Sequence, residues 1–286
     1  MNEFLKALFH PDIPVLRHAM FVGILSSVAF GIVGAFVVTR RITFIAAAIA
    51  HCVLGGIGAA LFLRAHAGLT WIEPIYGALP AAMLAALIIG VVSLRAKERE
   101  DTIIGAVWAV GMAIGLLLLA KTPGYNKDTM SYLFGDILLI TRRDVWVVAA
   151  LDIVVVGIAV FFYNKLLAIS FDEEFARTRG LAVERFYLLL LCLIAVTVVL
   201  LVYLVGIVLV IALLTLPAAV AGQFSRKMSR IMVIAVLLCM AFSSGGIALS
   251  YPYDLPSGPT IIVVGASVYL AVLAGKRLWR GRAHRV

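Results

Sequence analysis

The sequence predicts an all-α protein, a polytopic bundle of about eight or nine transmembrane helices. Of its 286 residues, 64% are hydrophobic and 14% are charged, whereas a soluble domain is about half apolar and a quarter charged. Apolar runs long enough to cross a bilayer follow one another nearly from end to end. A fold in water could not bury this much apolar surface, because accessible surface grows too fast with chain size. We therefore expect one transmembrane domain, residues 1–286, surrounded by a lipid bilayer.

Nine apolar runs define the expected helices, and most approach the roughly 20 residues that cross about 30 Å of hydrocarbon. The seventh run is short, contains Pro217 and follows the sixth almost directly. These two runs predict either a tight hairpin or a broken, re-entrant pair buried in protein, and that choice separates nine spans from eight. The runs are residues 18–38, 44–63, 76–94, 103–120, 145–167, 186–203, 206–221, 231–249 and 260–275.

The basic residues predict the orientation. The loops after the first, third, fifth and seventh runs, together with the C-terminal tail, hold 17 of the 24 Lys and Arg residues. Because cytoplasmic loops are enriched in Lys and Arg, we expect a cytoplasmic C-terminus and an external N-terminus, which requires an odd number of spans. Arg142 and Arg143 are a local exception on the outer side. The net charge of +9 lies in short loops, which fits anionic lipid rather than nucleic acid as a partner.

Three segments lie outside the expected spans. Residues 1–17 predict a short interfacial helix that is stopped by Pro11 and Pro14. Residues 131–140 are too few to span the membrane, so we expect a helical piece folded against the bundle from the outer side. Residues 276–286 form a basic cytoplasmic tail, which we expect to bind lipid headgroups.

One loop between apolar runs is unusually polar. Residues 170–184 read SFDEEFARTRGLAVE. We expect Ser170 to cap a short helix, the three acids after Phe171 to lie at its positive N-terminal end, and Gly180 to end it. Such a helix could dock a soluble partner. The same charges also fit a solvated connector.

Ionisable side chains inside the runs mark the candidate site, because they are costly in a bilayer unless they face protein or water. His51 lies about two turns into the second run, and a neutral imidazole can ligate zinc, manganese or iron. It can equally be hydrogen-bonded within the bundle and bind nothing. Cys52 points about 100° away from His51 around the helix, so we expect no shared ligation. Asp152 either pairs with Arg142 or Arg143 or faces a transport pathway.

Five stretches of the chain follow one another in a recognisable order. They are GIVGAFVVTRRITFIAAAIAHCVLGGIGAA (31–60), YLFGDIL (132–138), FDEEFARTRGL (171–181), VGIVLVIALLTLPAAVAG (205–222) and DLPSGPTIIVV (254–264). Together they resemble the permease subunits of ATP-binding-cassette importers for zinc, manganese and iron. The match covers nearly the whole chain and agrees with the expected topology.

The resemblance implies a type II ABC importer permease in the plasma or inner membrane. It further implies a homodimer around a central pathway, two cytoplasmic ATPase subunits and an extracytoplasmic metal-binding protein. The divalent metal is then the substrate, and no cofactor is bound permanently. In this reading residues 170–184 are the coupling helix that seats in the ATPase. Its expected coupling residues are Phe171, Asp172, Glu173, Glu174, Ala176, Arg179 and Gly180.

Within this resemblance, His51 matches a family His that usually follows an Asp by one turn, so that both point to one face. Here that earlier position is Ala47, and the partner carboxylate is missing. Its loss weakens oxygen-rich coordination and favours zinc over manganese, with iron also left open. Asp136 lies near the expected outer mouth of the pathway, where it either caps a helix or contacts metal. The candidate metal residues are therefore His51, Asp136 and Asp152.

Other transport and enzyme classes fit the sequence less well. The chain holds no GxxxxGK[ST] loop, so ATP hydrolysis is expected from a separate subunit and not from this one. An ABC permease for a metal chelate would be longer, with a wider cavity. An ion-coupled secondary transporter would show inverted repeats with interrupted helices and more intramembrane charge. An intramembrane metalloprotease would need a HExxH-like cluster, whereas His51 stands alone.

Overall fold

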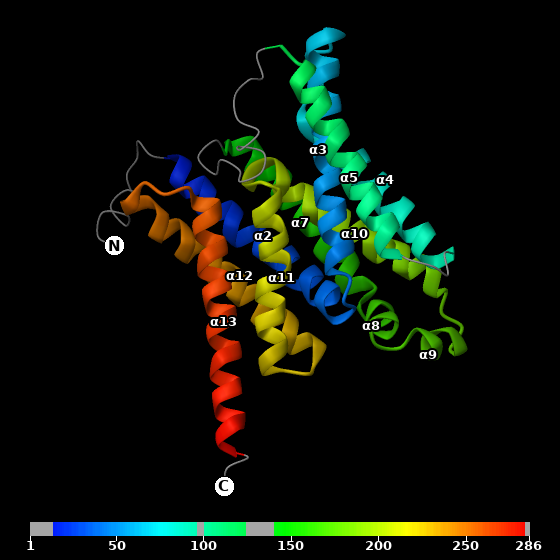
Figure 1. The fold of residues 1–286 in the computed structure, drawn as a ribbon, viewed down its shortest axis with the longest axis vertical. Helices are drawn as coiled ribbons and strands as arrows, with labels where there is room; N and C mark the ends of the chain where they lie inside the picture. The colour runs from blue at the N-terminus through cyan, green and yellow to red at the C-terminus, as the bar shows by residue number, and fades with distance from the viewer. Residues whose placement is uncertain (1–13, 96–99, 124–139, 284–286) are drawn as a thin grey trace.

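The computed structural model describes residues 14–95, 100–123 and 140–283 (Figure 1). Within these ranges the long elements are all helices, and nine of them are long and apolar enough to cross a membrane. The predicted all-α, membrane-spanning architecture is therefore confirmed, with nine candidate spans rather than eight. The residues 1–13, and the segment 131–140 apart from Ile140, lie outside the described part of the chain.

The helices follow the apolar runs, with three differences at their ends. The first helix begins at Pro14, so residues 14–17 are continuous with it, and the candidate span within it begins at Leu16. The fifth run is broken at Phe162 into two helices, and the last helix continues into the basic tail as far as Ala283. In order, the elements are α2 (Pro14–Thr39), α3 (Thr43–His66), α4 (Pro74–Arg95), α5 (Glu100–Lys121), α7 (Arg142–Phe161), α8 (Tyr163–Phe171), α9 (Glu173–Thr178), α10 (Val183–Val205), α11 (Ile207–Phe224), α12 (Met228–Ser250), the 3₁₀ turn η2 (Tyr251–Tyr253) and α13 (Ser257–Ala283).

A single residue, Gly206, separates α10 from α11. Its φ of +84° lies in a region that glycine adopts without a steric penalty. The chain therefore ends one helix and starts the next within one residue, and both helices qualify as spans. This agrees with the predicted tight connection between two spans and not with one broken, re-entrant element.

The helices form two packing groups joined by α10. In one group α3 packs against α4 and α5, and Figure 1 shows these three helices together at the upper right. In the other, α2 packs against α7, α11 and α12, while α13 packs against α11 and α12. Helix α10 contacts members of both groups. The α2–α3 turn, residues 40–42, is a covalent joint between the groups.

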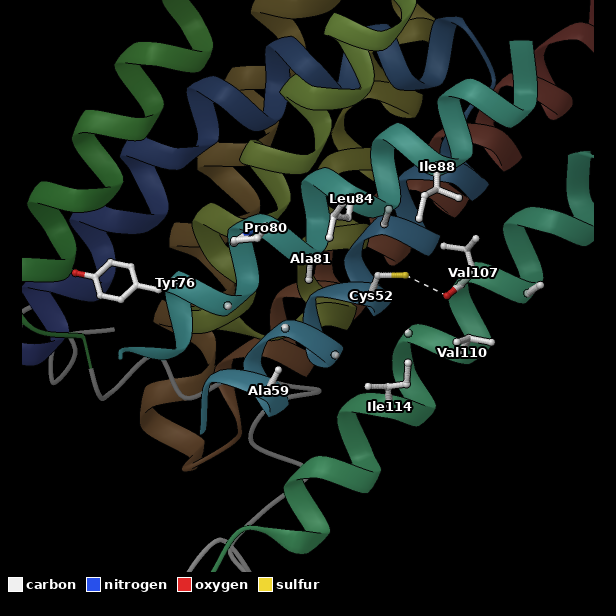
Figure 2. Close-up of a pocket in the computed structure, with 16 residues that line it drawn as sticks. Cys52, Ala59, Tyr76, Pro80, Ala81, Leu84, Ile88, Val107, Val110 and Ile114 are labelled. Carbon is white, nitrogen blue, oxygen red and sulfur yellow. Dashed lines mark hydrogen bonds between the residues drawn. The ribbon is translucent and has the colours of Figure 1, made fainter. Parts of the chain in front are cut away.

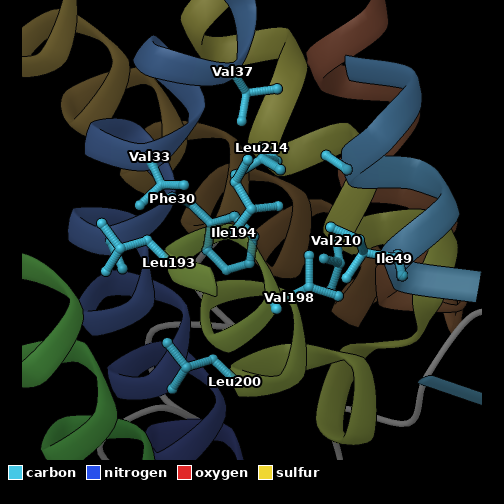
Figure 3. Close-up of a cluster of buried hydrophobic side chains, with 14 of the residues drawn as sticks. Phe30, Val33, Val37, Ile49, Leu193, Ile194, Val198, Leu200, Val210 and Leu214 are labelled. Carbon is cyan, nitrogen blue, oxygen red and sulfur yellow. The ribbon is translucent and has the colours of Figure 1, made fainter. Parts of the chain in front are cut away.

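The buried centre lies where α2, α10 and α11 meet. Phe30 of α2, Ile194 of α10 and Leu214 of α11 are at most 1% exposed, and Figure 3 shows them side by side. All three side chains are apolar, as expected where helices are enclosed by other helices. The centre is thus a packed interior of the bundle.

Glycines let α3 approach its two neighbours closely. A Cβ atom on Gly56 would lie 2.1 Å from the carbonyl oxygen of Gly77 in α4. On the other side, a Cβ atom on Gly58 would lie 2.6 Å from the carbonyl oxygen of Gly115 in α5. Small residues at such crossings allow backbone contact, which is a principal source of helix association in membranes.

The substitution Gly56→Ala is expected to lower the thermal unfolding midpoint of the purified chain in detergent. The added methyl group must push α3 away from α4, and overpacking of this kind costs about 1–3 kcal/mol. Gly105→Ala in α5 is the matched control, because a Cβ atom there meets nothing within 4 Å. Equal midpoints for the two variants would contradict the close α3–α4 contact.

Candidate functional site

His51 is held in one orientation on α3. Its Nδ1 lies 2.8 Å from the carbonyl oxygen of Ala47, and because a carbonyl can only accept, Nδ1 carries the proton. Nε2 of the neutral ring then keeps its lone pair. The ring also lies against Trp108 of α5, with the ring centroids 4.4 Å apart. This arrangement matches metal-binding histidines, whose second nitrogen usually donates to a carbonyl or carboxylate.

The position one turn before His51 offers no carboxylate. Ala47 is buried, and its carbonyl oxygen already accepts from the imidazole. Among the residues that the structure describes, no three His, Cys, Asp or Glu side chains gather closely enough to hold a metal ion. Within that part of the chain, His51 thus offers one side-chain nitrogen and not a complete coordination shell.

Asp152 on α7 interacts with the backbone of α2, and it pairs with no basic side chain in the part of the chain that the structure describes. Its Oδ1 accepts from the backbone N–H of Ala29 at 3.1 Å, and the residue is 5% exposed. Arg143, one of the two partners expected for Asp152, instead donates from Nη1 to Glu73 at 2.7 Å. Asp152 also lies on a helix of the other packing group, so the structure does not gather it with His51.

We expect Asp152→Asn to keep most of the stability of the parent, since an amide oxygen can accept the same N–H. Asp152→Leu removes the acceptor and should lower the free energy of unfolding by about 1 kcal/mol. Thermal unfolding of the two variants in one detergent measures the difference. If Asn and Leu are equally destabilising, the hydrogen bond to α2 is not what the carboxyl group contributes.

An apolar groove of about 710 Å³ opens between α4 and α5, with α3 as its floor. Figure 2 shows Leu84, Val110 and Ile114 lining it. Cys52 also faces this groove, where its Sγ lies 3.2 Å from the carbonyl oxygen of Val107. Neither a carboxylate nor an imidazole is among the lining residues. The groove therefore suits hydrocarbon, and it is not a candidate path for an ion.

The expected short helix in the polar loop is α9. Its cap is Asp172, whose Oδ1 accepts from the N–H of Phe175 at 2.9 Å. The prediction that Ser170 caps it is wrong. Helix α8 continues through Phe171, so Ser170 lies in its last turn and donates to the carbonyl oxygen of Leu166 at 2.7 Å.

Gly180 ends the segment as expected. It has a φ of +77°, and its N–H donates to the carbonyl of Arg177, while the N–H of Leu181 donates to that of Ala176. These two bonds form a Schellman motif, which favours glycine at the left-handed position.

The α8–α9 segment exposes aromatic and acidic side chains together with Lys165, Arg177 and Arg179. Ala176 is buried at 1% exposure, whereas Phe171 and Phe175 are 61% and 53% exposed. Asp172, Glu173 and Glu174 are exposed beside them. Exposed phenylalanines next to charges, at the end of the bundle, are typical of a protein-binding surface.

Sequence reasoning missed two neighbours of the candidate residues, Trp108 and Arg40. Trp108 lies 57 positions from His51, and Arg40 contacts Glu173 across a separation of 133 positions. A helical hydrophobic pattern carries no signal for either contact. The remaining predicted residue, Asp136, lies outside the part of the chain that the structure describes and stays a prediction.

In the ranges that the structure describes, nine helices are long and apolar enough to cross a bilayer, as in a multi-pass membrane protein, and the polar α8–α9 segment lies at one end of the bundle. The chain belongs to the ABC 3 transport family, whose model matches residues 12–276. As a member of that family it is a transport subunit in the membrane.

Known relatives cover nearly the whole chain. A probable metal transport system membrane protein of Chlamydia trachomatis is 39% identical over 97% of this chain and 93% of its own length. The manganese transport system membrane protein MntC of Halalkalibacterium halodurans is 30% identical over 93% and 91%. Among solved structures, PsaBC from Streptococcus pneumoniae in complex with Fab superposes with a TM-score of 0.82 at 26% identity, over 95% of this chain and 94% of that chain.

Proposed function

We propose that this chain is the permease subunit of an ATP-driven importer of divalent metal ions, with zinc as the favoured cargo. The observation that carries the proposal is His51, an intramembrane imidazole whose Nδ1 is fixed by a carbonyl and whose Nε2 is left as a ligand. Family membership and relatives named for metal or manganese transport support the cargo class. The metal is the substrate, and Asp136 and Asp152 are secondary candidates for contact with it.

The preference for zinc rests on Ala47. A carboxylate at that position would add a hard oxygen ligand, which manganese prefers, whereas zinc is bound well by imidazole nitrogen. A single nitrogen ligand also fits transient binding, because a pathway must release its ion. A second copy of the chain would bring a second His51 to a shared pathway.

The proposed assembly is a homodimer of this chain with two ATPase subunits and an extracytoplasmic metal-binding protein. The chain would lie in the plasma or inner membrane with its N-terminus outside and its C-terminus in the cytoplasm. The excess of Lys and Arg in the loops placed inside supports this orientation, and the pairs Arg40–Glu173 and Arg143–Glu73 agree with which loops share a side.

The α8–α9 segment is the proposed coupling element. Its exposed phenylalanines and acids would sit in the ATPase, and closure of the ATPase on ATP would displace the segment. The spans would then tilt and open the region of His51 alternately to the two sides. The coupling residues are Phe171, Asp172, Glu173, Glu174, Ala176, Arg179 and Gly180.

The cargo assignment can be tested by uptake of Zn²⁺, Mn²⁺ and Fe²⁺ at equal free concentrations into vesicles that hold the assembled importer. We expect zinc uptake to exceed that of the other two ions. In the Ala47→Asp variant, the added carboxylate should shift the uptake ratio toward manganese by about tenfold, which corresponds to ~1.4 kcal/mol of altered coordination.

The parent and the Ala47→Ser variant are the controls. Serine changes the size of the side chain but adds no charge. Equal uptake of all three ions by the parent, or an unchanged ratio in Ala47→Asp, would contradict the role given to this position.

A further inference from the structure

Arg40, in the turn between α2 and α3, contacts three parts of the chain at once. Its Nη2 forms an ion pair with Glu173 of α9, and its Nη1 donates to the carbonyl oxygen of Ile169 in α8 at 2.6 Å. The guanidinium also lies over the ring of Tyr187 in α10, 4.3 Å from the centroid. One side chain thus joins the proposed coupling element to the α2–α3 turn.

The environment of Arg40 makes these contacts stronger than those of a surface charge. The Arg40 side chain is only 11% exposed, and Tyr187 is 3% exposed. A guanidinium can serve a carboxylate, a carbonyl and an aromatic face together, because its donors lie in a rigid plane and its face can stack. The amino group of lysine cannot reproduce that geometry.

The turn that carries Arg40 is itself tightly defined. Arg41 has a φ of +61°, and the N–H groups of Arg41 and Ile42 donate to the carbonyls of Val38 and Val37. This is a Schellman motif with a non-glycine residue at the left-handed position, where a Cβ atom is unfavourable. The turn leads directly into α3 at Thr43, two turns before His51.

Side-chain contacts also connect Arg40 to the packing group formed by α3, α4 and α5. The hydroxyl of Tyr187 lies 3.2 Å from the hydroxyl of Ser93 in α4. Helices α3 and α4 belong to the group that carries His51, and α2 belongs to the other. Arg40 is therefore linked to the His51 group through the backbone turn and through Tyr187.

We propose that Arg40 is a positioning residue that transmits displacement of the α8–α9 segment to the α3–α4–α5 group and so to His51. The inference rests on the proposed function, because it assigns a transmission path to that importer. Arg40 does not touch the cargo or the ATPase in this account. It holds the coupling element to the joint between the two packing groups.

The test is the number of ATP molecules hydrolysed per zinc ion imported, measured in vesicles with the permease, its ATPase and the metal-binding protein. Arg40→Gln should raise this ratio about tenfold, because it removes a charge-assisted pair and a stacked cation. Arg40→Lys keeps the charge and should raise it less. Glu173→Gln should raise it about threefold, since its carboxylate is 47% exposed and contributes only one contact.

Arg143→Gln is the matched control, because it breaks the exposed Arg143–Glu73 pair and should leave the ratio unchanged. The ATPase must co-purify with every variant. If Arg40→Gln loses the ATPase, or imports zinc at the parental ratio, the transmission role is overturned while the importer itself stands. Where Arg40→Gln does not fold, a parental ratio in Glu173→Gln overturns it instead. Failure of the parent to import zinc on ATP would refute the proposed function itself.

Discussion

Replacing His51 by alanine should reduce ATP-dependent zinc uptake by about a hundredfold, without loss of folded protein. Even the groups that merely orient a metal-bound histidine contribute about 10- to 100-fold to affinity or activity, so loss of the nitrogen itself should reach the upper end. The ring of His51 packs on Trp108 of α5, and His51 is only half-buried. Its removal should therefore leave the packed centre of the bundle intact. Initial rates of ⁶⁵Zn²⁺ uptake measure the effect.

The control for this prediction is His66→Ala. His66 lies on the same helix, contacts the carbonyl oxygen of Phe62 one turn earlier at 3.3 Å, and stacks on its ring. It differs from His51 in being exposed at the end of α3. Parental uptake by His66→Ala together with strongly reduced uptake by His51→Ala supports the assignment. Parental uptake by both variants would remove His51 from the mechanism.

Phe175→Ala should weaken association with the ATPase about thirtyfold, with little change in the fold of the permease. Phe175 is 53% exposed on α9 and stacks under the guanidinium of Arg179, with 5.1 Å from the guanidinium carbon to the ring centroid. Aromatic anchors of this kind often contribute about 2 kcal/mol or more to an interface. Titration of the purified ATPase against permease in nanodiscs measures the affinity.

Phe161→Ala provides the comparison for Phe175→Ala. Phe161 is 80% exposed, but it belongs to the candidate span α7, where we expect lipid and not protein to cover it. Its variant should bind the ATPase like the parent. Equal affinities for the Phe161 and Phe175 variants would show that α9 is not the docking surface.

The sequence was sufficient for the features that depend on local composition. The nine apolar runs correspond to nine candidate spans among the described residues, because the length and apolarity of a run determine whether its helix can cross a membrane. Gly180 was recognisable as a helix end because only glycine adopts a left-handed conformation at little cost. The short helix α9 could be predicted because acidic residues, which favour the N-terminal end of a helix, come before that glycine.

Features that depend on where two helices end, or on distant contacts, could not be predicted. Ser170 and Asp172 are both favourable caps, and only the actual end of α8 at Phe171 selects Asp172. The hydrogen bond from Ala29 to Asp152 spans 123 positions, and composition gives no indication of it. The nearby arginines suggested an ion pair for Asp152, yet Arg143 is bound by Glu73.

The most direct test of the central claim is zinc accumulation in proteoliposomes that contain the permease with or without its ATPase. The permease, the ATPase and the extracytoplasmic metal-binding protein are combined, and zinc inside the vesicles is followed with and without ATP. We predict accumulation only when both the ATPase and ATP are present. Accumulation driven by an ion gradient in vesicles that lack the ATPase would contradict the account, because the chain would then transport as a secondary transporter without the coupling segment.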